Sequence, residues 1–568
     1  MKKATYNAIC CLVAFIFCCI NVYAQSGATS SAKRPHDWWQ ADWKKDSIPG
    51  ISLDKAYNYL KGRKSKPVIV ALIDGSLDID HNDLKDCIWI NKKELPGNGI
   101  DDDNNGYVDD MNGWCFTANK NNIYRNKQSS LEADVYKTWK KKFEHVDPKK
   151  LTGVDKVQYQ IYLDGKVKLF EKLKILYLGG ILPVDTTNLT IDSARFVQYL
   201  DHLLPQYKDT IISNIPFAEL PFNNKYDSAA NQLFAIITHH SHDWDFRLIE
   251  FDSSNKYQPG YTTYFVSYAL KYNKTVLDDT ITNYREFIGD DPNNFDERYY
   301  GTPTINIPSP HIENMLHATM IAGIIAAKVN SKNGMRGITG NVQIMELNTG
   351  VPDGGSEAKD IVSAIYYAVN NGVSIINISL RPTGIEPHVR ELRAAFAYAD
   401  KHNVLIVSAS GNDGVDLDNE KYLMGQGTEG REHDTYIRVG ANTYRMDDHL
   451  IWEFSDFGKN TVDIFAPGAK IYSTAPGNEY VTESGTSLAC PVVVGVAAIL
   501  KSYFPTLTAK QIKEILMKSA YKPNLMVIAP FGSGITIKIP FSEMSKSGGI
   551  VNAYNAVKLA DEMIKKSK

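Results

Sequence analysis

The chain has 568 residues, 43% of them hydrophobic and 22% charged, so it is long enough to bury a large core and is long for a single domain. Its formal net charge of −3 gives no reason to expect nucleic acid as a partner. Only three cysteines follow residue 24, which are Cys87, Cys115 and Cys490. Three are too few for a disulfide framework, although the sequence allows a single disulfide between Cys87 and Cys115.

The first 24 residues predict a secretory signal peptide. Lys2 and Lys3 precede an apolar run from Ala8 to Ile20, and cleavage would follow Ala24. This run is short for a membrane-spanning helix, and an uncleaved anchor is the alternative. We therefore expect a secreted protein, periplasmic or extracellular, that has no membrane span once the signal is removed.

The segment from Pro67 to Asp74 reads PVIVALID, a continuous run of β-branched and aliphatic residues that ends in an acid. Such a run is typical of a strand buried on both faces of a parallel sheet. Ligands and catalytic groups gather at the carboxyl ends of these strands, and Asp74 occupies that position. The alternative is an ordinary turn aspartate, because Gly75 follows it.

An acidic segment, DDDNNGYVDDMN, runs from Asp101 to Asn112. Oxygen-bearing side chains alternate along it in the manner of a calcium loop, and glycine occupies the sixth place, where the loop must turn sharply. The predicted ligands are Asp101, Asp103, Asn105 and Asp109. The twelfth place holds Asn112 instead of the glutamate of an EF-hand, so a solvated acidic turn is the alternative.

The block from about Asn119 to Pro310 differs in composition from the rest, with helix-like stretches rich in Lys, Leu and Tyr. Two domains, or one domain with a large insertion, would account for the length of the chain. A cluster of His239, His240 and His242 could bind a metal ion in a metal-dependent hydrolase. A polar helix end or loop is the better interpretation, because no further ligand group accompanies it at a telling spacing.

After this block, predicted strands alternate with predicted helices. His317 lies near the start of an apolar, small-residue helix, and strands are expected at Val342–Asn348, Val373–Leu380 and Val404–Ser410. A helix is expected between the first two, at Ser356–Asn370. This alternation predicts a three-layer α/β/α fold with a mainly parallel sheet.

A tight loop from Ser484 to Ser487 runs into an apolar stretch from Leu488 to Leu500, which places Ser487 at or next to a helix N-terminus. The first turn of a helix has unpaired backbone N–H groups and a partial positive charge, so an anion beside Ser487 would be stabilised. The alternative is that Ser487 serves only as the N-cap of that helix.

Four segments in order resemble motifs of the subtilisin-like serine peptidases: VIVALIDGSLDIDHNDL, LHATMIAGIIAA, SASGNDG and SGTSLACP. The resemblance implies that Asp74 is the triad acid, His317 the base, Ser487 the nucleophile and Asn412 the oxyanion-hole amide. It covers about residues 50–118 and 310–558, and it also implies bound Ca²⁺, which many relatives use for stability.

The resemblance also implies a substrate-pairing strand that ends near Ser379 and Leu380, with Arg381 at the rim of the specificity pocket. Three departures from the family's motifs stand out. Ala318 and Met320 replace a glycine and a histidine, and Arg381-Pro382 replace a pair of glycines. A proline there has no N–H to donate to a substrate.

The expected organisation is a signal peptide (1–24), a peptidase domain in two parts (25–118 and 311–558), an insertion (119–310) and a C-terminal tail (559–568). We expect the insertion, which is largely helical, to be a lid or specificity module. The implied function is that of a secreted serine endopeptidase that cuts protein or peptide substrates through an acyl-enzyme. The alternative function is that of a catalytically inactive binding protein with the same fold.

Overall fold

The computed structural model describes residues 37–122 and 288–566 with short gaps, and scattered residues between 136 and 167. The chain forms two compact units, one of them containing 127–284 and the other 14–126, 285–531 and 535–568. In the first unit the described residues include a cluster of aromatic rings, Phe143, Tyr159 and Tyr162. The signal peptide, the histidine cluster and most of the insertion lie outside the described residues.

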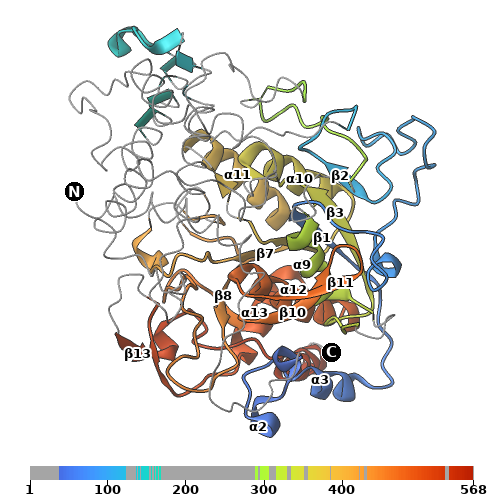
Figure 1. Cartoon of the computed structure of the whole chain (residues 1–568), viewed down its shortest axis with the longest axis vertical. Coiled ribbons are helices and arrows are strands. Elements are labelled where there is room, and N and C mark those ends of the chain that lie inside the picture. The colour runs from blue at the N-terminus through green and yellow to red at the C-terminus, as the bar shows by residue number, and fades with distance from the viewer. Residues whose placement is uncertain are drawn as a thin grey trace, which may run out of the picture. The chain divides into compact units, whose positions relative to one another are not determined.

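The second unit is built on a seven-stranded sheet with the order β2-β3-β1-β5-β7-β8-β9, and every neighbouring pair in it is parallel (Figure 1). This confirms the predicted parallel sheet. The prediction did not include β2, β8 and β9. In sheet order the strands are Gly113–Cys115, Val342–Asn348, Val68–Asp74, Ile375–Ile378, Leu405–Ala409, Tyr436–Asn442 and Ile464–Pro467.

Side chains alternate between the two faces of the sheet, as the pleat of a strand requires. On β1, Val68, Val70 and Leu72 join a core that includes helices α9 (Leu316–Ala326) and α12 (Thr486–Tyr503). Ala71 and Ile73 join a second core with helices α10 (Ala358–Asn370) and α11 (Glu386–Lys401). Helices therefore cover both faces, which confirms the three-layer α/β/α fold (Figure 1).

The remaining elements surround this framework. The helices are α2 (Trp43–Asp46), α3 (Leu53–Leu60), α13 (Ala509–Ser519) and α14 (Ala553–Lys566), with short 3₁₀ turns at Trp38–Gln40, Lys85–Cys87, Pro148–Lys150, Leu417–Asn419 and Phe541–Glu543. Three two-stranded sheets pair β4 (Ser356–Glu357) with β6 (Pro382–Thr383), β10 (Ile471–Ala475) with β11 (Glu479–Glu483), and β12 (Met526–Ile528) with β13 (Lys538–Pro540).

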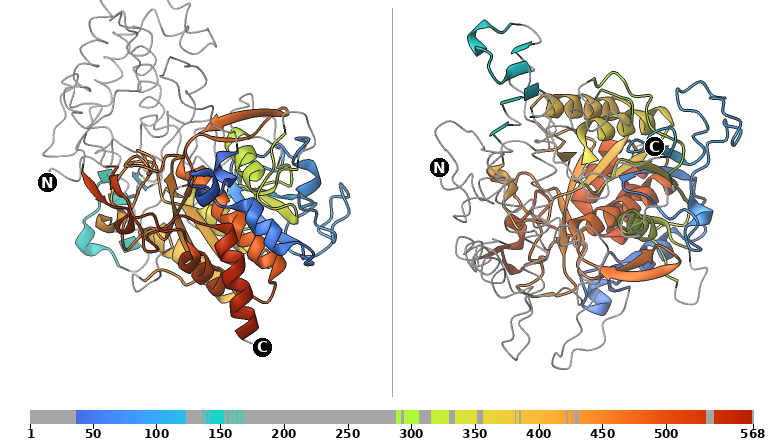
Figure 2. Two further views of the ribbon diagram at one scale, coloured as in Figure 1. Left: turned by 90° about the horizontal axis from the view of Figure 1, so that it is seen from below. Right: turned by 45° about the horizontal axis from the view of Figure 1, so that its top comes forward.

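The expected C-terminal tail is in fact part of the fold. Helix α14 continues to Lys566 and packs against α3, as Figure 2 shows. Nη1 of Arg63, on the segment after α3, donates to Oδ1 of Asp561 at 2.7 Å. The hydroxyl of Tyr59 donates to the other carboxylate oxygen. The error arose because the boundary was placed where the motif resemblance ended, whereas the helix is stabilised by packing that extends beyond it.

Two further sequence-based expectations can be compared with the structure. Cys87, Cys115 and Cys490 are all buried, and none of them forms a disulfide, so the possible bridge between the first two is absent. Among the described residues one helix, α12, is long and apolar enough to cross a membrane, but 83% of its apolar window is buried inside the fold. It is the central helix of a core.

Candidate active site

Asp74 is the last residue of β1 and is almost fully buried, at 1% exposure. Its Oδ1 atom accepts a hydrogen bond from the backbone N–H of Gly75 and lies 2.7 Å from Nδ1 of His317. A carboxylate can only accept, so Nδ1 of His317 carries the hydrogen and Nε2 is left as the unprotonated nitrogen of the neutral ring. The fold thus joins two residues that are 243 positions apart in the sequence.

His317 is the second residue of helix α9, and hydroxyl groups of β10 hold the beginning of that helix. Thr474 donates to the carbonyl of Thr319, and Ser473 donates to the carbonyl of Met320. This approach is very close, because a Cβ atom on Gly323 would lie 2.2 Å from Oγ1 of Thr474. The glycine is therefore required for α9 to present His317 beside the end of β1.

The environment of His317 favours its protonated form. Burial alone would lower the pKa of His317, but the charge of Asp74 and the hydrogen bond to it outweigh burial and raise that pKa above its ordinary value. The pair is thus suited to take up a proton and to stabilise the resulting imidazolium.

Ser487 is the second residue of α12, which confirms the predicted position at a helix N-terminus. The N-cap is Gly485, and its backbone starts the helix without a side-chain cap, so the alternative that Ser487 serves as the cap is wrong. The carbonyl of Ser487 accepts a hydrogen bond of 2.9 Å from the hydroxyl of Ser379, just after β5. This bond ties the start of α12 to the sheet.

Asn412, in the loop after β7, is oriented by a residue that the sequence analysis missed. Its Oδ1 atom accepts from both the backbone N–H of Thr486, at 3.0 Å, and the Thr486 hydroxyl, at 2.7 Å. These two bonds use only the oxygen, so they leave the amide nitrogen able to donate elsewhere. A Cβ placed on Gly485 would lie 3.7 Å from Nδ2 of Asn412 and 3.8 Å from Oγ of Ser487, so the two groups flank the same point.

The predicted substrate-binding residues follow β5. The Ser379 side chain is used inside the protein, since its hydroxyl also accepts from Nδ2 of Asn377, and Leu380 is half-buried. Arg381 lies outside the described residues, and Pro382 begins the short strand β6. Substrate pairing with the backbone near Ser379 and Leu380 stays a prediction.

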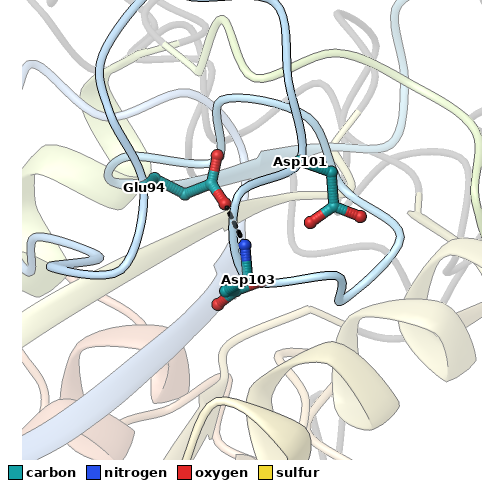
Figure 3. A group of neighbouring side chains, drawn as sticks. All are labelled: Glu94, Asp101 and Asp103. Carbon is teal, nitrogen blue, oxygen red and sulfur yellow. Dashed lines mark hydrogen bonds between the residues drawn. The ribbon is translucent and has the colours of Figure 1, made fainter.

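The acidic loop brings together two of its four predicted ligands with a third carboxylate. Oxygen atoms of Glu94, Asp101 and Asp103 all lie within 4.8 Å of one another (Figure 3). Glu94 is buried, and it also accepts from the backbone N–H of Asp103 at 3.1 Å. Two oxygens that share one calcium ion are at most about 5 Å apart, so this group fits a calcium ion.

The other two predicted ligands are used differently. Asp109 lies outside the three-carboxylate group, because its oxygens accept the backbone N–H groups of Gly97, Asn98 and Gly99. The side-chain oxygen of Asn105 accepts from the N–H of Tyr107. The alternating motif identified the loop correctly, but it gave no signal for Glu94, which precedes the motif by seven residues.

A parallel α/β sheet with an Asp–His pair at its carboxyl edge, and a serine at a neighbouring helix N-terminus, is typical of serine hydrolases that use a catalytic triad. Comparison with known proteins identifies the family. Residues 65–534 match the model of the Subtilase family, Peptidase_S8. The chain therefore belongs to the subtilase family.

Individual relatives agree with this assignment. The chain is 33% identical over 242 residues to the thermophilic serine proteinase of Bacillus sp. (strain AK1), a match that covers 42% of this chain and 52% of that protein. It is 34% identical over 225 residues to subtilisin DY of Bacillus licheniformis, covering 39% and 74% respectively. Among solved structures, the chain is 26% identical to a lanthipeptide protease, with a TM-score of 0.34. The match covers 43% of this chain and 75% of the lanthipeptide protease, and it adds nothing to the family assignment.

Proposed function

We propose that this protein is a secreted serine endopeptidase in which Ser487, His317 and Asp74 form the catalytic triad. The observation that carries the proposal is the 2.7 Å contact between Nδ1 of His317 and Oδ1 of Asp74, in a chain whose family includes serine proteases. This contact fixes the tautomer that a general base needs, with Nε2 unprotonated and available.

The proposed reaction follows from the chemistry of these groups. His317 removes the proton of the Ser487 hydroxyl as its oxygen attacks the peptide carbonyl, and later passes that proton to the leaving amine. Asp74 orients the ring and stabilises the imidazolium. The oxyanion receives hydrogen bonds from the side-chain amide of Asn412 and from the backbone N–H of Ser487 at the N-terminus of α12.

Peptides are the proposed substrates, because an extended chain can pair with the backbone that follows β5. Arg381 is proposed to shape the neighbouring pocket. A cleavage profile over a peptide library tests this, since Arg381→Gly should change which side chains are accepted. The insertion, residues 119–310, is proposed to act as a lid or specificity module, and its deletion should alter the same profile.

Calcium is proposed to bind at Glu94, Asp101 and Asp103. There it would cross-link the loop and stabilise it, and it would take no part in the reaction. The support is the cluster of hard carboxylate oxygens at separations that suit one ion. Secretion is proposed from the N-terminal pattern alone. N-terminal sequencing of the protein recovered outside the cytoplasm should begin at Gln25.

The central proposal is tested with a fluorophosphonate probe, which reacts with activated serine nucleophiles. The wild-type chain should be labelled and should cleave peptides, and Ser487→Ala should do neither. The expected loss of kcat in this variant is on the order of 10⁶-fold, a magnitude known for the nucleophile of the relative subtilisin. Ser484→Ala, three residues away, is the matched control and should be labelled normally. A wild-type chain that folds but is never labelled would instead be a binding protein with this fold.

A further inference from the structure

Glu346 is a carboxyl group in a row of aliphatic side chains. It lies on β3 in register with Leu72 of β1, and Asn348, two residues further on, is in register with Asp74. Because alternate residues share a face, Glu346 lies on the face that carries Asp74 and that packs against α9 and α12. Glu346 and Asp74 are thus diagonal neighbours on adjacent strands, close enough for a long side chain to reach the other.

Both side chains contain buried oxygens with no hydrogen-bond donor. Glu346 is 0% exposed, and neither Oε1 nor Oε2 has a hydrogen-bond partner among the described residues. Oδ2 of Asp74 is also buried and has no partner in this part of the chain. Burying a polar group without a partner is costly, so nearly all such groups in proteins are paired.

The protonation state of Glu346 resolves this apparent shortage of donors. Burial, and then the nearby charge of Asp74, raise the pKa of Glu346 well above its ordinary value. Two carboxylates in the same apolar layer would repel each other. A protonated carboxyl group avoids that repulsion, and it supplies one O–H donor where a buried acceptor needs one.

Among the described residues, Asp74 is the one charged group that contributes to the pKa shift of Glu346, and the titratable groups on the neighbouring elements have other partners. On α9, Nδ1 of His317 is bonded to the other oxygen of Asp74. On α12, the thiol of Cys490 donates to Oδ1 of Asn377 and to a backbone carbonyl. On β2, the thiol of Cys115 is paired with the hydroxyl of Thr117.

We propose that Glu346 is a positioning residue for the catalytic acid: its carboxyl group keeps its proton and donates a hydrogen bond to Oδ2 of Asp74, directly or through one buried water molecule. Asp74 is then held at both oxygens, by Gly75 and His317 at Oδ1 and by Glu346 at Oδ2. A donor of this kind stabilises the ionised form of Asp74 and fixes its orientation toward His317. The inference rests on the proposed peptidase function.

Two substitutions separate this role from a purely structural one. Glu346→Gln keeps a donor and the size of the side chain, and should retain kcat within about 5-fold. Glu346→Met has a similar volume and no donor, and should reduce kcat roughly 10- to 100-fold with little change in KM. Gln343→Met, the same kind of change on the opposite face of β3, is the matched control and should behave as wild type.

Two spectroscopic measurements do not depend on turnover. In a Ser487→Ala background, the NMR titration of His317 should be unchanged by Glu346→Gln and should move to a higher pKa in Glu346→Met, where Asp74 loses its partner. Burial raises the pKa of Glu483 to about 7, so this group loses its proton above that pH and no longer contributes to the infrared band of protonated carboxyl groups. At alkaline pH the band should persist in the wild type because of Glu346, and it should vanish in Glu346→Gln.

Any one of three results would overturn the proposal. The wild type could lack the infrared band, or the Gln and Met variants could have equal kcat. The third is a lower pKa of His317 in Glu346→Gln, which is the change that removal of a nearby negative charge would produce. The infrared measurement on the wild type decides the question even if a variant fails to fold. Failure of the proposed function has a different signature, since the wild type itself would then cleave no peptide whatever the state of Glu346.

Discussion

The group around Ser487 is held together by long-range hydrogen bonds, whereas most of those in the acidic loop around Asp101 are local. In the first, hydrogen bonds join residues 243, 108 and 74 positions apart, and strands or helices carry most of the partners. In the second, Glu94 accepts from Asp103, Asp109 from Gly97 and Asp110 from Asn91, over 9, 12 and 19 positions. A long-range bond also joins the loop to helix α10, from the hydroxyl of Tyr367 to Asp110, 257 positions apart.

This difference teaches what each site depends on. The catalytic group is positioned by a packed sheet and its helices, so its geometry needs no ligand. The loop holds three carboxylates close together by backbone N–H groups, and like charges at that separation repel unless a cation lies between them. We therefore expect substitutions in the first region to change rates, and substitutions in the second to change stability.

The largest effect, after loss of the nucleophile itself, is expected from Asp74→Asn. The amide can no longer hold Nδ1–H of His317 in the productive tautomer, and kcat should fall by about 10⁴-fold. The base must be neutral to act, so activity rises with pH through the pKa of His317. Because the charge of Asp74 helps to raise that pKa, the acid limb of kcat/KM should move to lower pH in the variant.

Asp78→Asn is the matched control for this prediction. Asp78 is also buried, but its carboxylate accepts the N–H groups of Asp80 and Gly477. Its replacement should lower stability and leave kcat within a few-fold of wild type, with an unchanged acid limb. Comparable kcat values for the two variants would show that the Asp74–His317 contact has no special part in the reaction.

A smaller effect on the rate is expected from Asn412→Ala. Removing one donor to the oxyanion should lower kcat by roughly 10²- to 10³-fold and leave KM nearly unchanged, because the donor acts on the transition state. Thr486→Val removes only the hydroxyl that helps to orient Asn412 and keeps the backbone N–H, so it should cost less. A higher KM with normal kcat in Asn412→Ala would place Asn412 in substrate binding instead.

The smallest effect on the rate, but a clear effect on stability, is expected at the acidic loop. With calcium at about 100 times its Kd, binding contributes about 2.7 kcal/mol to the free energy of unfolding, so chelation should lower the Tm by roughly 5 °C. Glu94→Gln should lower the Tm in calcium and weaken the response to a chelator, because one of the three carboxylates is lost. The initial rate of peptide cleavage should stay close to that of the wild type.

Asp54→Asn provides the control. Asp54 is an exposed carboxylate that lies outside the acidic loop and pairs with Arg336. It should leave both the Tm and the response to chelation unchanged. If calcium and chelator have no effect on the wild-type Tm, the loop is only a solvated acidic turn.

The sequence by itself determined the framework and the main chemical groups. A continuous apolar run predicted β1, since strands buried on both faces are rich in such residues. A further buried strand was predicted at Val342–Asn348, and β3 has these bounds although it contains Gln343 and Glu346. The helix N-terminus at Ser487 followed from a tight loop before an apolar stretch. Both features are local, so neighbouring residues in the chain carry the signal for them.

The tertiary structure decided how those groups are supported. Strand register and loop folding bring Thr486 to Asn412, Glu94 to Asp101, and Glu346 to a position diagonal to Asp74. No spacing in the sequence reveals these neighbours. For the same reason Asp109 could not be told from a metal ligand, because its oxygens meet backbone N–H groups only once the loop has closed. A sequence motif specifies which atoms are available, and only packing specifies which atoms meet.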